Sequence, residues 1–313
     1  MWKTDGGVVL VTEKESRQVA MQMLDVYAGI LFHNRAFTDG NWDEVIYDLD
    51  HQAYAELRET YALERIAGKG SDFVRAKRLM HYLAPRLTHS SWYDNHVECN
   101  ALRLLEYSLN DPDHGINCLN KSKILQECCC AVGIYARRVS IMPYSPYDFD
   151  NHVVTEIFDK ELDKWVMLDV TTDGYFIDEN KTPLSVLQMR DQFACGEFVT
   201  FVRAGESMKD IHRLREKHAQ TNAYICKNLF WFKMERYAGF GEKGEFLWLV
   251  PRGFSVKNNL IANAEYRLRN LPDAYADFRK IWEERRKQAQ DREEYPYTTI
   301  DAMTVKPGKQ LVD

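Results

Sequence analysis

A cysteine, a histidine and an aspartate in the middle of the chain have the chemistry of a nucleophile, its base and the group that orients the base. Cys118 follows Gly115-Ile116-Asn117 and opens the helix-like run CLNKSKILQECCCAVG. A helix N-terminus places unpaired N–H groups and a partial positive charge beside a thiol, which lower its pKa and can bind an oxyanion. Cys118 is therefore a candidate nucleophile, and the alternative is a small, buried and inert cysteine.

The count and spacing of the cysteines favour free thiols in a reducing compartment. Seven cysteines, three of them consecutive, are a poor framework for disulfides. At helical spacing Cys118 shares a face with Leu125, Cys129 and Val132, with Ser122 between them, and we expect this face to be buried. Five other cysteines are interpreted as inert and buried: Cys128, Cys129, Cys130, Cys195 and Cys226.

The segment NHVVTEIFDKELDKWVMLDVT, residues 151–171, predicts a β-hairpin that could hold the base. With residues 159–162 as a four-residue loop, Phe158 lies opposite Asp163 and His152 lies opposite Asp169. Opposed residues have Cβ atoms about 4.5–5.5 Å apart, so a carboxylate could fix the imidazole tautomer and leave its other nitrogen for a thiol. The alternative is a surface hairpin with an incidental His–Asp pair.

These residues together resemble the core of the transglutaminase-like superfamily, a papain-like group that includes transglutaminases, peptide N-glycanases and many bacterial proteases. That core has a Cys opening a helix, a Gly-Ile-x-Ala-Arg turn, a His starting a strand and an Asp ending the next. The matching elements are Cys118, Gly133-Ile134-Tyr135-Ala136-Arg137, Asn151-His152-Val153 and Trp165-Val166-Met167-Leu168-Asp169. The spacing from Cys118 to Gly133 is also similar, and the likeness covers residues 72–201.

The resemblance implies an enzyme that transfers acyl groups from amides of peptides, proteins or other substrates through a thioester on Cys118, with His152 as base and Asp169 as its orienter. Water as acceptor would make a peptidase or amidase, and an amine would make a transglutaminase-type transferase. Hydrolysis is favoured because the chain shows no calcium-binding acidic loops. No cofactor is expected. A non-catalytic binding module with the same fold is a further alternative.

Aromatic residues in two loops are candidates for binding the substrate. Members of the superfamily often supply a second oxyanion donor from a segment before the Cys helix, and Trp92 and Tyr93 occupy such a segment. In the loop PYSPYDFDN before the histidine, Tyr144, Tyr147 and Phe149 could line a cleft. Simple packing is the alternative for both sets.

The order of predicted elements indicates an α+β fold, with N-terminal helices, a central Cys-bearing helix and antiparallel strands. Helices are expected over 13–36, 41–66, 71–84, 97–109, 118–131, 206–219 and 258–291, and strands over 135–142, 152–158, 165–170, 197–202 and 246–250. We divide the chain into a helical region (1–70), a catalytic core (71–203) and a C-terminal extension packed on it (204–313). Helix 258–291 could cover the core or form a dimer contact, so the oligomeric state is left open.

Composition and charge limit the classes of partner that the chain is expected to bind. Of 313 residues 45% are hydrophobic and 28% charged, as in globular proteins, and the net charge of -6 argues against nucleic acid. The first residues do not read as a signal peptide, and apolar runs are too short to cross a membrane, so a cytoplasmic location is predicted. His96-x-x-Cys99 and His114-x-x-x-Cys118 have zinc-ligand types and form a rival, but their connecting spacing matches no zinc-finger pattern, so no metal is expected.

Overall fold

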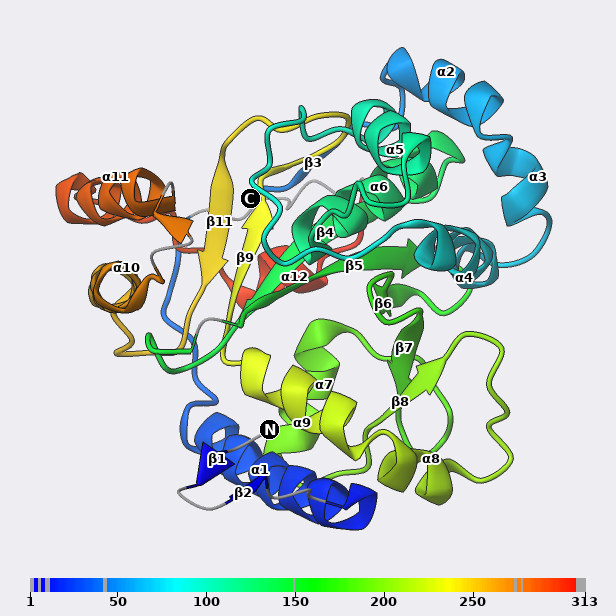
Figure 1. Cartoon of the computed structure of the whole chain (residues 1–313). Coiled ribbons are helices and arrows are strands. Elements are labelled where there is room, and N and C mark those ends of the chain that lie inside the picture. Colours follow the sequence, from blue (N-terminus) through cyan, green and yellow to red (C-terminus); the bar gives the residue numbers. More distant parts are fainter. Residues whose placement is uncertain are drawn as a thin grey trace.

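A computed structural model describes residues 3–4, 7–8, 12–41, 44–148, 150–272, 275–276 and 278–307. Its centre is a seven-stranded sheet in the order β11-β9-β4-β5-β6-β7-β8, in which every neighbouring pair is antiparallel (Figure 1). The strands are β4 (Ala136–Met142), β5 (His152–Asp159), β6 (Lys164–Asp169), β7 (Gly174–Ile177), β8 (Thr200–Arg203), β9 (Trp231–Glu235) and β11 (Phe246–Leu249). The mixture of helices with an antiparallel sheet confirms the α+β class.

Helices cover both faces of this sheet, and the strand alternation separates two hydrophobic cores. In β6, Val166 and Leu168 belong to one core and Met167 belongs to the other. The first core includes α2 (Ala53–Thr60), α3 (Leu63–Ala67), α4 (Asp72–Leu83), α5 (Ala101–Asn110) and α6 (Cys118–Ala131). The second includes α1 (Glu13–His33), α7 (Val186–Ala194) and α9 (Ala219–Asn228). Helix α8 (Ile211–Lys217) precedes α9, but its buried residues belong to the first core.

Helix α6 is the central helix of the first layer. It packs on β4 and β5 and is covered by α2, α4 and α5, so every residue from 120 to 131 is buried. We expected only one face to be buried. Burial of polar residues around the whole helix requires internal partners, because an unpaired polar group away from water is costly.

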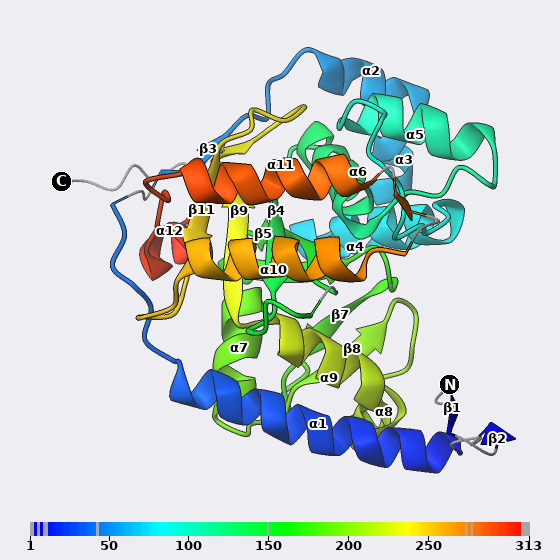
Figure 2. The same ribbon diagram turned by 60° about the vertical axis from the view of Figure 1, so that its left-hand side comes forward.

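The predicted core boundary at residue 203 does not coincide with an edge of the sheet. Strands β9 and β11 come from the C-terminal region and complete one side of the sheet, and Phe230, Trp231 and Phe232 are buried there. Helices α10 (Val256–Asn270) and α11 (Phe278–Asp291) lie side by side (Figure 2). From the N-terminal region, α1 packs along α9.

Two segments that were each predicted as one continuous helix are divided into several elements. The range 41–66 contains strand β3 (Ile46–Tyr47), paired in parallel with β10 (Tyr237–Ala238), and then two short helices separated by Ala62, whose φ of +51° is left-handed. The range 258–291 is divided into α10 and α11, because Pro272 follows the last turn of α10 and proline cannot continue a helix. Strand β7 and helices α7 and α9 were not predicted, and α12 (Ile300–Thr304) lies in the tail.

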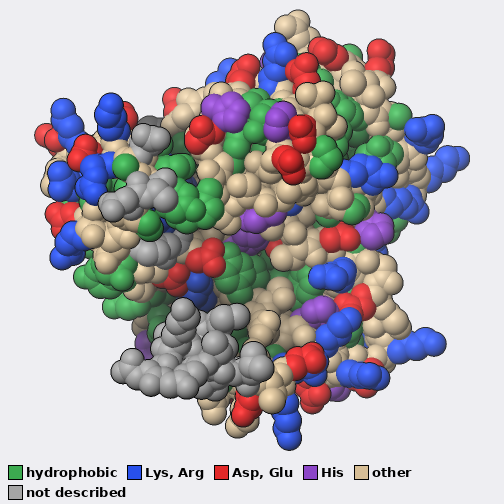
Figure 3. All heavy atoms as spheres, viewed as in Figure 1, with side chains coloured by type: hydrophobic (Ala, Val, Ile, Leu, Met, Phe, Trp, Pro, Cys, Tyr) green, Lys and Arg blue, Asp and Glu red, His purple; other side chains and the backbone are tan. Residues whose placement is uncertain are grey.

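Surface charge is mixed. Figure 3 shows Lys and Arg side chains intermixed with Asp and Glu over the face in view. Within the described ranges, no helix is both long enough and apolar enough to cross a membrane.

Candidate active site

The N-terminus of α6 is fixed by an asparagine cap. Asn117 Oδ1 accepts from the N–H of Asn120 at 3.2 Å, and Asn117 Nδ2 donates to Asn95 Oδ1 at 3.1 Å. Such a cap satisfies one of the free N–H groups of the first turn. Cys118 is the first helical residue and is only partly buried, so its thiol lies beside the remaining free amides and within reach of solvent.

The chain that leads into α6 lies directly against residues 88–90. The N–H of Ile116 donates to Thr88 O, and the N–H of Ser90 donates to Ile116 O, both at 3.0 Å. A Cβ on Gly115 would lie 2.9 Å from the Cβ of Ser90, so this approach requires glycine unless the serine moves. The loop before the helix is therefore held beside the Cys118 end of α6.

Two side-chain hydrogen bonds fasten β5 to the middle of α6. Ser122 Oγ donates to Val153 O at 2.7 Å, and Thr155 Oγ1 donates to Ser122 O at 3.0 Å. Both bonds are buried, where they are not weakened by competition with water. They fix the start of β5, and therefore His152, relative to the helix that carries Cys118.

His152 and Asp169 are in contact, although the predicted hairpin register is wrong by two residues. Phe158 lies opposite Trp165, not Asp163, and continuing this register puts Asp169 one diagonal step from His152. The slip arises because Asp159 remains in the strand, and its carboxylate accepts the N–H groups of Glu161 and Leu162 at 2.9 and 2.8 Å. A two-residue slip keeps each side chain on its predicted face.

The histidine–aspartate pair is buried, and both carboxylate oxygens of Asp169 are hydrogen-bonded. His152 Nε2 lies 2.9 Å from Asp169 Oδ2, which leaves Nδ1 for another partner. Asp169 Oδ2 also accepts from Thr172 Oγ1 at 2.7 Å, and Oδ1 accepts from the N–H of Thr171 at 2.9 Å. Burial raises the pKa of Asp169, but the imidazole and the threonine donors outweigh it and hold that pKa below its usual range.

The pKa of His152 lies well above its usual value. Burial favours the neutral ring, but the charge and hydrogen bond of Asp169 outweigh that penalty. The neighbouring Cys118 side chain raises the pKa of His152 further. The surroundings therefore favour a protonated imidazole beside an ionised Asp169 carboxylate.

Sequence reasoning missed three neighbours of these residues. The Tyr224 ring lies edge-on to the His152 ring at 5.6 Å, and its hydroxyl donates to Asp150 Oδ1 at 3.1 Å. Lys121, one turn beyond Cys118 and 2% exposed, has a pKa lowered by burial and raised in part by the charges of Asp169 and Cys118. The pKa of His89 is lowered by burial and by the charges of Lys121 and His152. Only the helical spacing of Lys121 from Cys118 could have been noticed in the sequence.

The predicted substrate-binding aromatics do not gather at one place. Trp92 stacks on Tyr275 with ring centroids 4.0 Å apart, and Tyr93 is buried, its hydroxyl accepting the N–H of Val97 at 3.1 Å. From the same segment, His89 interacts electrostatically with His152. Tyr147 contacts Tyr266 at 5.2 Å between ring centroids, and Phe149 lies outside the described residues.

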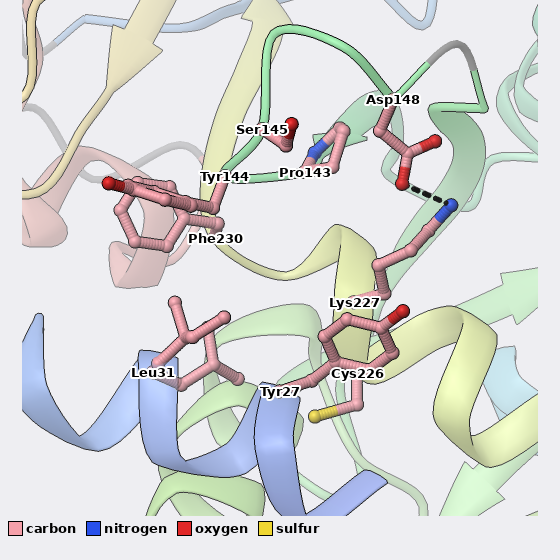
Figure 4. A pocket seen from close by; sticks show the side chains of 10 residues that line it. Tyr27, Leu31, Pro143, Tyr144, Ser145, Asp148, Cys226, Lys227 and Phe230 are labelled. Atoms are coloured by element: carbon pink, nitrogen blue, oxygen red, sulfur yellow. Dashed lines mark ion pairs between the residues drawn. The ribbon is translucent and has the colours of Figure 1, made fainter. Parts of the chain in front are cut away.

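Tyr144 lines a pocket between α1, α9 and the loop after β4 (Figure 4). Its ring lies against Phe230 at 4.9 Å between centroids, while Tyr27 and Leu31 enter from α1. On the same loop, Asp148 forms a 2.9 Å ion pair with Lys227, whose ammonium also donates to Asp150 O at 3.1 Å. The pocket therefore lies under the loop that leads into His152, and helix α9 holds that loop.

Side chains of the two candidate zinc pairs form hydrogen bonds within the protein. His114 Nδ1 bonds to Tyr107 O at 2.9 Å, and His96 Nδ1 bonds to Asp94. Cys99 Sγ accepts from an Arg138 N–H at 3.5 Å. Across the described part of the chain, no three His, Cys, Asp or Glu side chains are grouped to hold a metal ion.

All seven cysteines are free, and they differ in their exposure to solvent. Cys128, Cys129, Cys130 and Cys226 are buried as expected, and burial raises the pKa of each thiol. Cys195 is exposed, which corrects its expected burial, because it caps α7 at the surface. Comparison of the chain with protein-family models, curated proteins and solved structures gave no match.

Proposed function

We propose that this chain is a cysteine-nucleophile enzyme that transfers acyl groups from amide substrates, with hydrolysis as the favoured outcome. The observation that carries the proposal is the buried His152–Asp169 pair, together with a cysteine at the capped N-terminus of α6 that raises the pKa of His152. A structural cysteine needs neither a raised-pKa imidazole nor free amides beside it. The chemistry of this arrangement matches the transglutaminase-like resemblance of the sequence.

The reaction would begin with transfer of the Cys118 proton to His152, since Nε2 is occupied by Asp169 and Nδ1 remains for the thiol. The thiolate attacks the amide carbonyl. The N–H groups at the start of α6 that donate to no other described group can donate to the oxyanion and stabilise it. His152 then gives its proton to the departing amine, and a thioester remains on Cys118. Water, deprotonated by His152, would release the acid and regenerate the thiol.

Transfer to an amine uses the same side chains, so the acceptor decides between a peptidase or amidase and a transglutaminase-type transferase. We favour water because none of the described contacts at the site is dedicated to an amine acceptor. Free thiols fit a reducing compartment such as the cytoplasm. The substrate would be a peptide, a protein or another amide.

The test is the pH dependence of iodoacetamide labelling, followed residue by residue by mass spectrometry. Cys195 is a control within the same molecule, because it is exposed and no imidazole is bonded to it. Cys118 is expected to label at pH values below the ordinary thiol pKa of about 8.5, where Cys195 reacts slowly. His152→Ala should remove this advantage and leave Cys195 unchanged. Equal rates at the two cysteines, or no effect of the mutation, would reject the proposal in favour of a binding module.

A further inference from the structure

Lys121 is a buried amine on the face of α6 that carries the proposed nucleophile. It lies three residues after Cys118 and is 2% exposed. Side chains on a helix lean towards its N-terminus, so the lysine extends back over the turn that contains Cys118. Burial lowers the pKa of Lys121, and the charges of Asp169 and Cys118 act on it in the opposite direction.

The acids at the site, Asp169 and Asp150, already accept hydrogen bonds from other residues. Asp169 accepts three hydrogen bonds, from His152, Thr171 and Thr172. Asp150 accepts the Tyr224 hydroxyl. Among the described residues, none forms a hydrogen bond or an ion pair with the Lys121 ammonium. Burial of the Lys121 side chain, with no partner to replace the lost solvation, lowers its pKa.

The remaining polar neighbour is no competitor for an anion. Burial, Lys121 and His152 together lower the pKa of His89, so its ring is held towards the neutral form. His152 is itself bonded to Asp169. Lys121 is therefore an uncommitted cationic donor three residues from Cys118, and a negatively charged group that binds there would supply the partner that its ammonium lacks.

We propose that Lys121 binds a carboxylate of the substrate, so that the preferred substrates are amides with a carboxylate next to the bond that Cys118 attacks. This inference rests on the proposed acyl transfer and adds the charge of the substrate to it. A peptide with a free carboxylate adjoining the scissile amide has the required chemistry. Neutral amides of the same shape would bind without this contact.

The rival role for Lys121 is to support the thiolate of Cys118 and nothing else. That role predicts that loss of the ammonium slows every electrophile by the same factor. Carboxylate binding predicts a loss confined to anionic reagents. Two alkylating agents of similar size, iodoacetate and iodoacetamide, differ in this charge and separate the two roles.

The experiment compares the iodoacetate-to-iodoacetamide rate ratio at Cys118 in the wild type and in Lys121→Met, with Cys195 as internal reference. A unit charge a few ångströms away at the protein surface changes such a ratio by about tenfold, so we expect a loss of this size in the variant. The iodoacetamide rate should change much less, and Lys121→Gln should behave as Lys121→Met does. An unchanged ratio, or an equal slowing of both reagents, would overturn the inference.

A measurement on the wild type covers the case in which neither variant folds. N-acetylglycine, which carries a carboxylate, should protect Cys118 from iodoacetamide at concentrations where N-acetylglycinamide does not. Equal protection, or none, would contradict carboxylate binding. Failure of acyl transfer itself would appear differently, as an ordinary iodoacetamide rate at Cys118 that is indifferent to His152→Ala.

Discussion

Helix α6 buries two lysines only two residues apart, and they have opposite surroundings. Lys123 Nζ donates to Gly239 O at 3.0 Å and lies 3.2 Å from Glu127 and 3.6 Å from Glu235. Lys121 has no such partner among the described residues, although it is also buried. One ammonium is thus part of a closed ion cluster, and the other faces the end of the helix where Cys118 lies.

The cluster around Lys123 is continuous and connects several elements. Glu127 accepts the N–H groups of Ala101 at 2.7 Å and Gly241 at 2.8 Å, and Glu235 accepts from Arg138 at 2.8 Å. Burial still raises the pKa of Glu127 despite Lys123 and these amides. Each charge there has a partner within the fold, as a structural role requires.

The comparison shows how a buried charge that stabilises the fold can be distinguished from one that is free to bind a ligand. A charge that serves folding is neutralised inside the molecule, because leaving it unpaired would cost stability. A charge that serves a ligand keeps its donors free, and the folded state bears that cost until the ligand binds. The two lysines share helix, depth and residue type, so partnership is the variable that differs.

The largest expected effect is on stability, from Lys123→Met. It leaves Glu127 and part of Glu235 as uncompensated buried charge, and breaking a buried pair in this way costs about 3–5 kcal/mol. Urea unfolding at pH 7 measures this loss. Lys121→Met is the matched control on the same helix, and its free energy of unfolding should stay within about 1 kcal/mol of wild type or rise. Equal losses in both variants would remove the distinction.

A second, smaller effect concerns the pH dependence of stability at the site. The folded pKa of His152 is raised, so its contribution is complete below about pH 6.5 and is lost as pH rises through the folded pKa. The folded pKa of Asp169 is lowered, so its contribution is present above about pH 4 and is lost as pH falls through that folded value. The pair therefore stabilises fully between about pH 4 and 6.5.

Asp169→Asn removes the charge and tests that window. At pH 6 we expect a loss of about 2 kcal/mol, typical of a hydrogen bond between charged groups, and a shrinking difference from wild type as pH rises. Urea unfolding from pH 5 to 9 gives both values. Thr172→Val, which removes a neutral donor to the same carboxylate, should lose stability with no such trend. A difference that does not change with pH would mean that His152 is not protonated in the folded protein.

A structural feature could be predicted from the sequence where neighbouring residues determine it. Helix 118–131 was predicted with the bounds that the structure has, because Asn117 and Gly133 mark its ends locally. The histidine and aspartate faces were also right, since an error of two residues in a strand preserves the side. The register itself was wrong, because the carboxylate of Asp159 sets where the turn begins.

Features that depend on contacts between distant segments were not predictable. Trp92 was expected near the substrate, yet its stacking partner Tyr275 lies far along the chain. Tyr224 belongs to a helix that was not predicted, and only the packing of α9 brings it to His152. The lack of a partner for Lys121 is likewise a property of the assembled site, and no pattern in the sequence distinguishes it from Lys123.

The smallest expected effect concerns Tyr224, which acts on the site through the chain before His152. Its hydroxyl holds Asp150, two residues from the imidazole, and its ring lies against that imidazole. Tyr224→Phe removes one hydrogen bond worth about 1 kcal/mol, so iodoacetamide labelling of Cys118 should slow by about fivefold at most. Tyr224→Ala also removes the ring and should slow labelling further.

A role in positioning predicts more than a lower rate. If Tyr224 orients His152, the pH midpoint of Cys118 labelling should move towards that of Cys195 in Tyr224→Ala, and only slightly in Tyr224→Phe. A purely structural role would lower stability in both variants and leave the midpoint unchanged. Lys121 belongs to α6 and Tyr224 to α9, and Tyr224 contacts the imidazole. In Tyr224→Phe the ratio of iodoacetate to iodoacetamide labelling rates at Cys118 should therefore stay at the wild-type value. A ratio that fell as it does in Lys121→Met would show that the two neighbours are not separate.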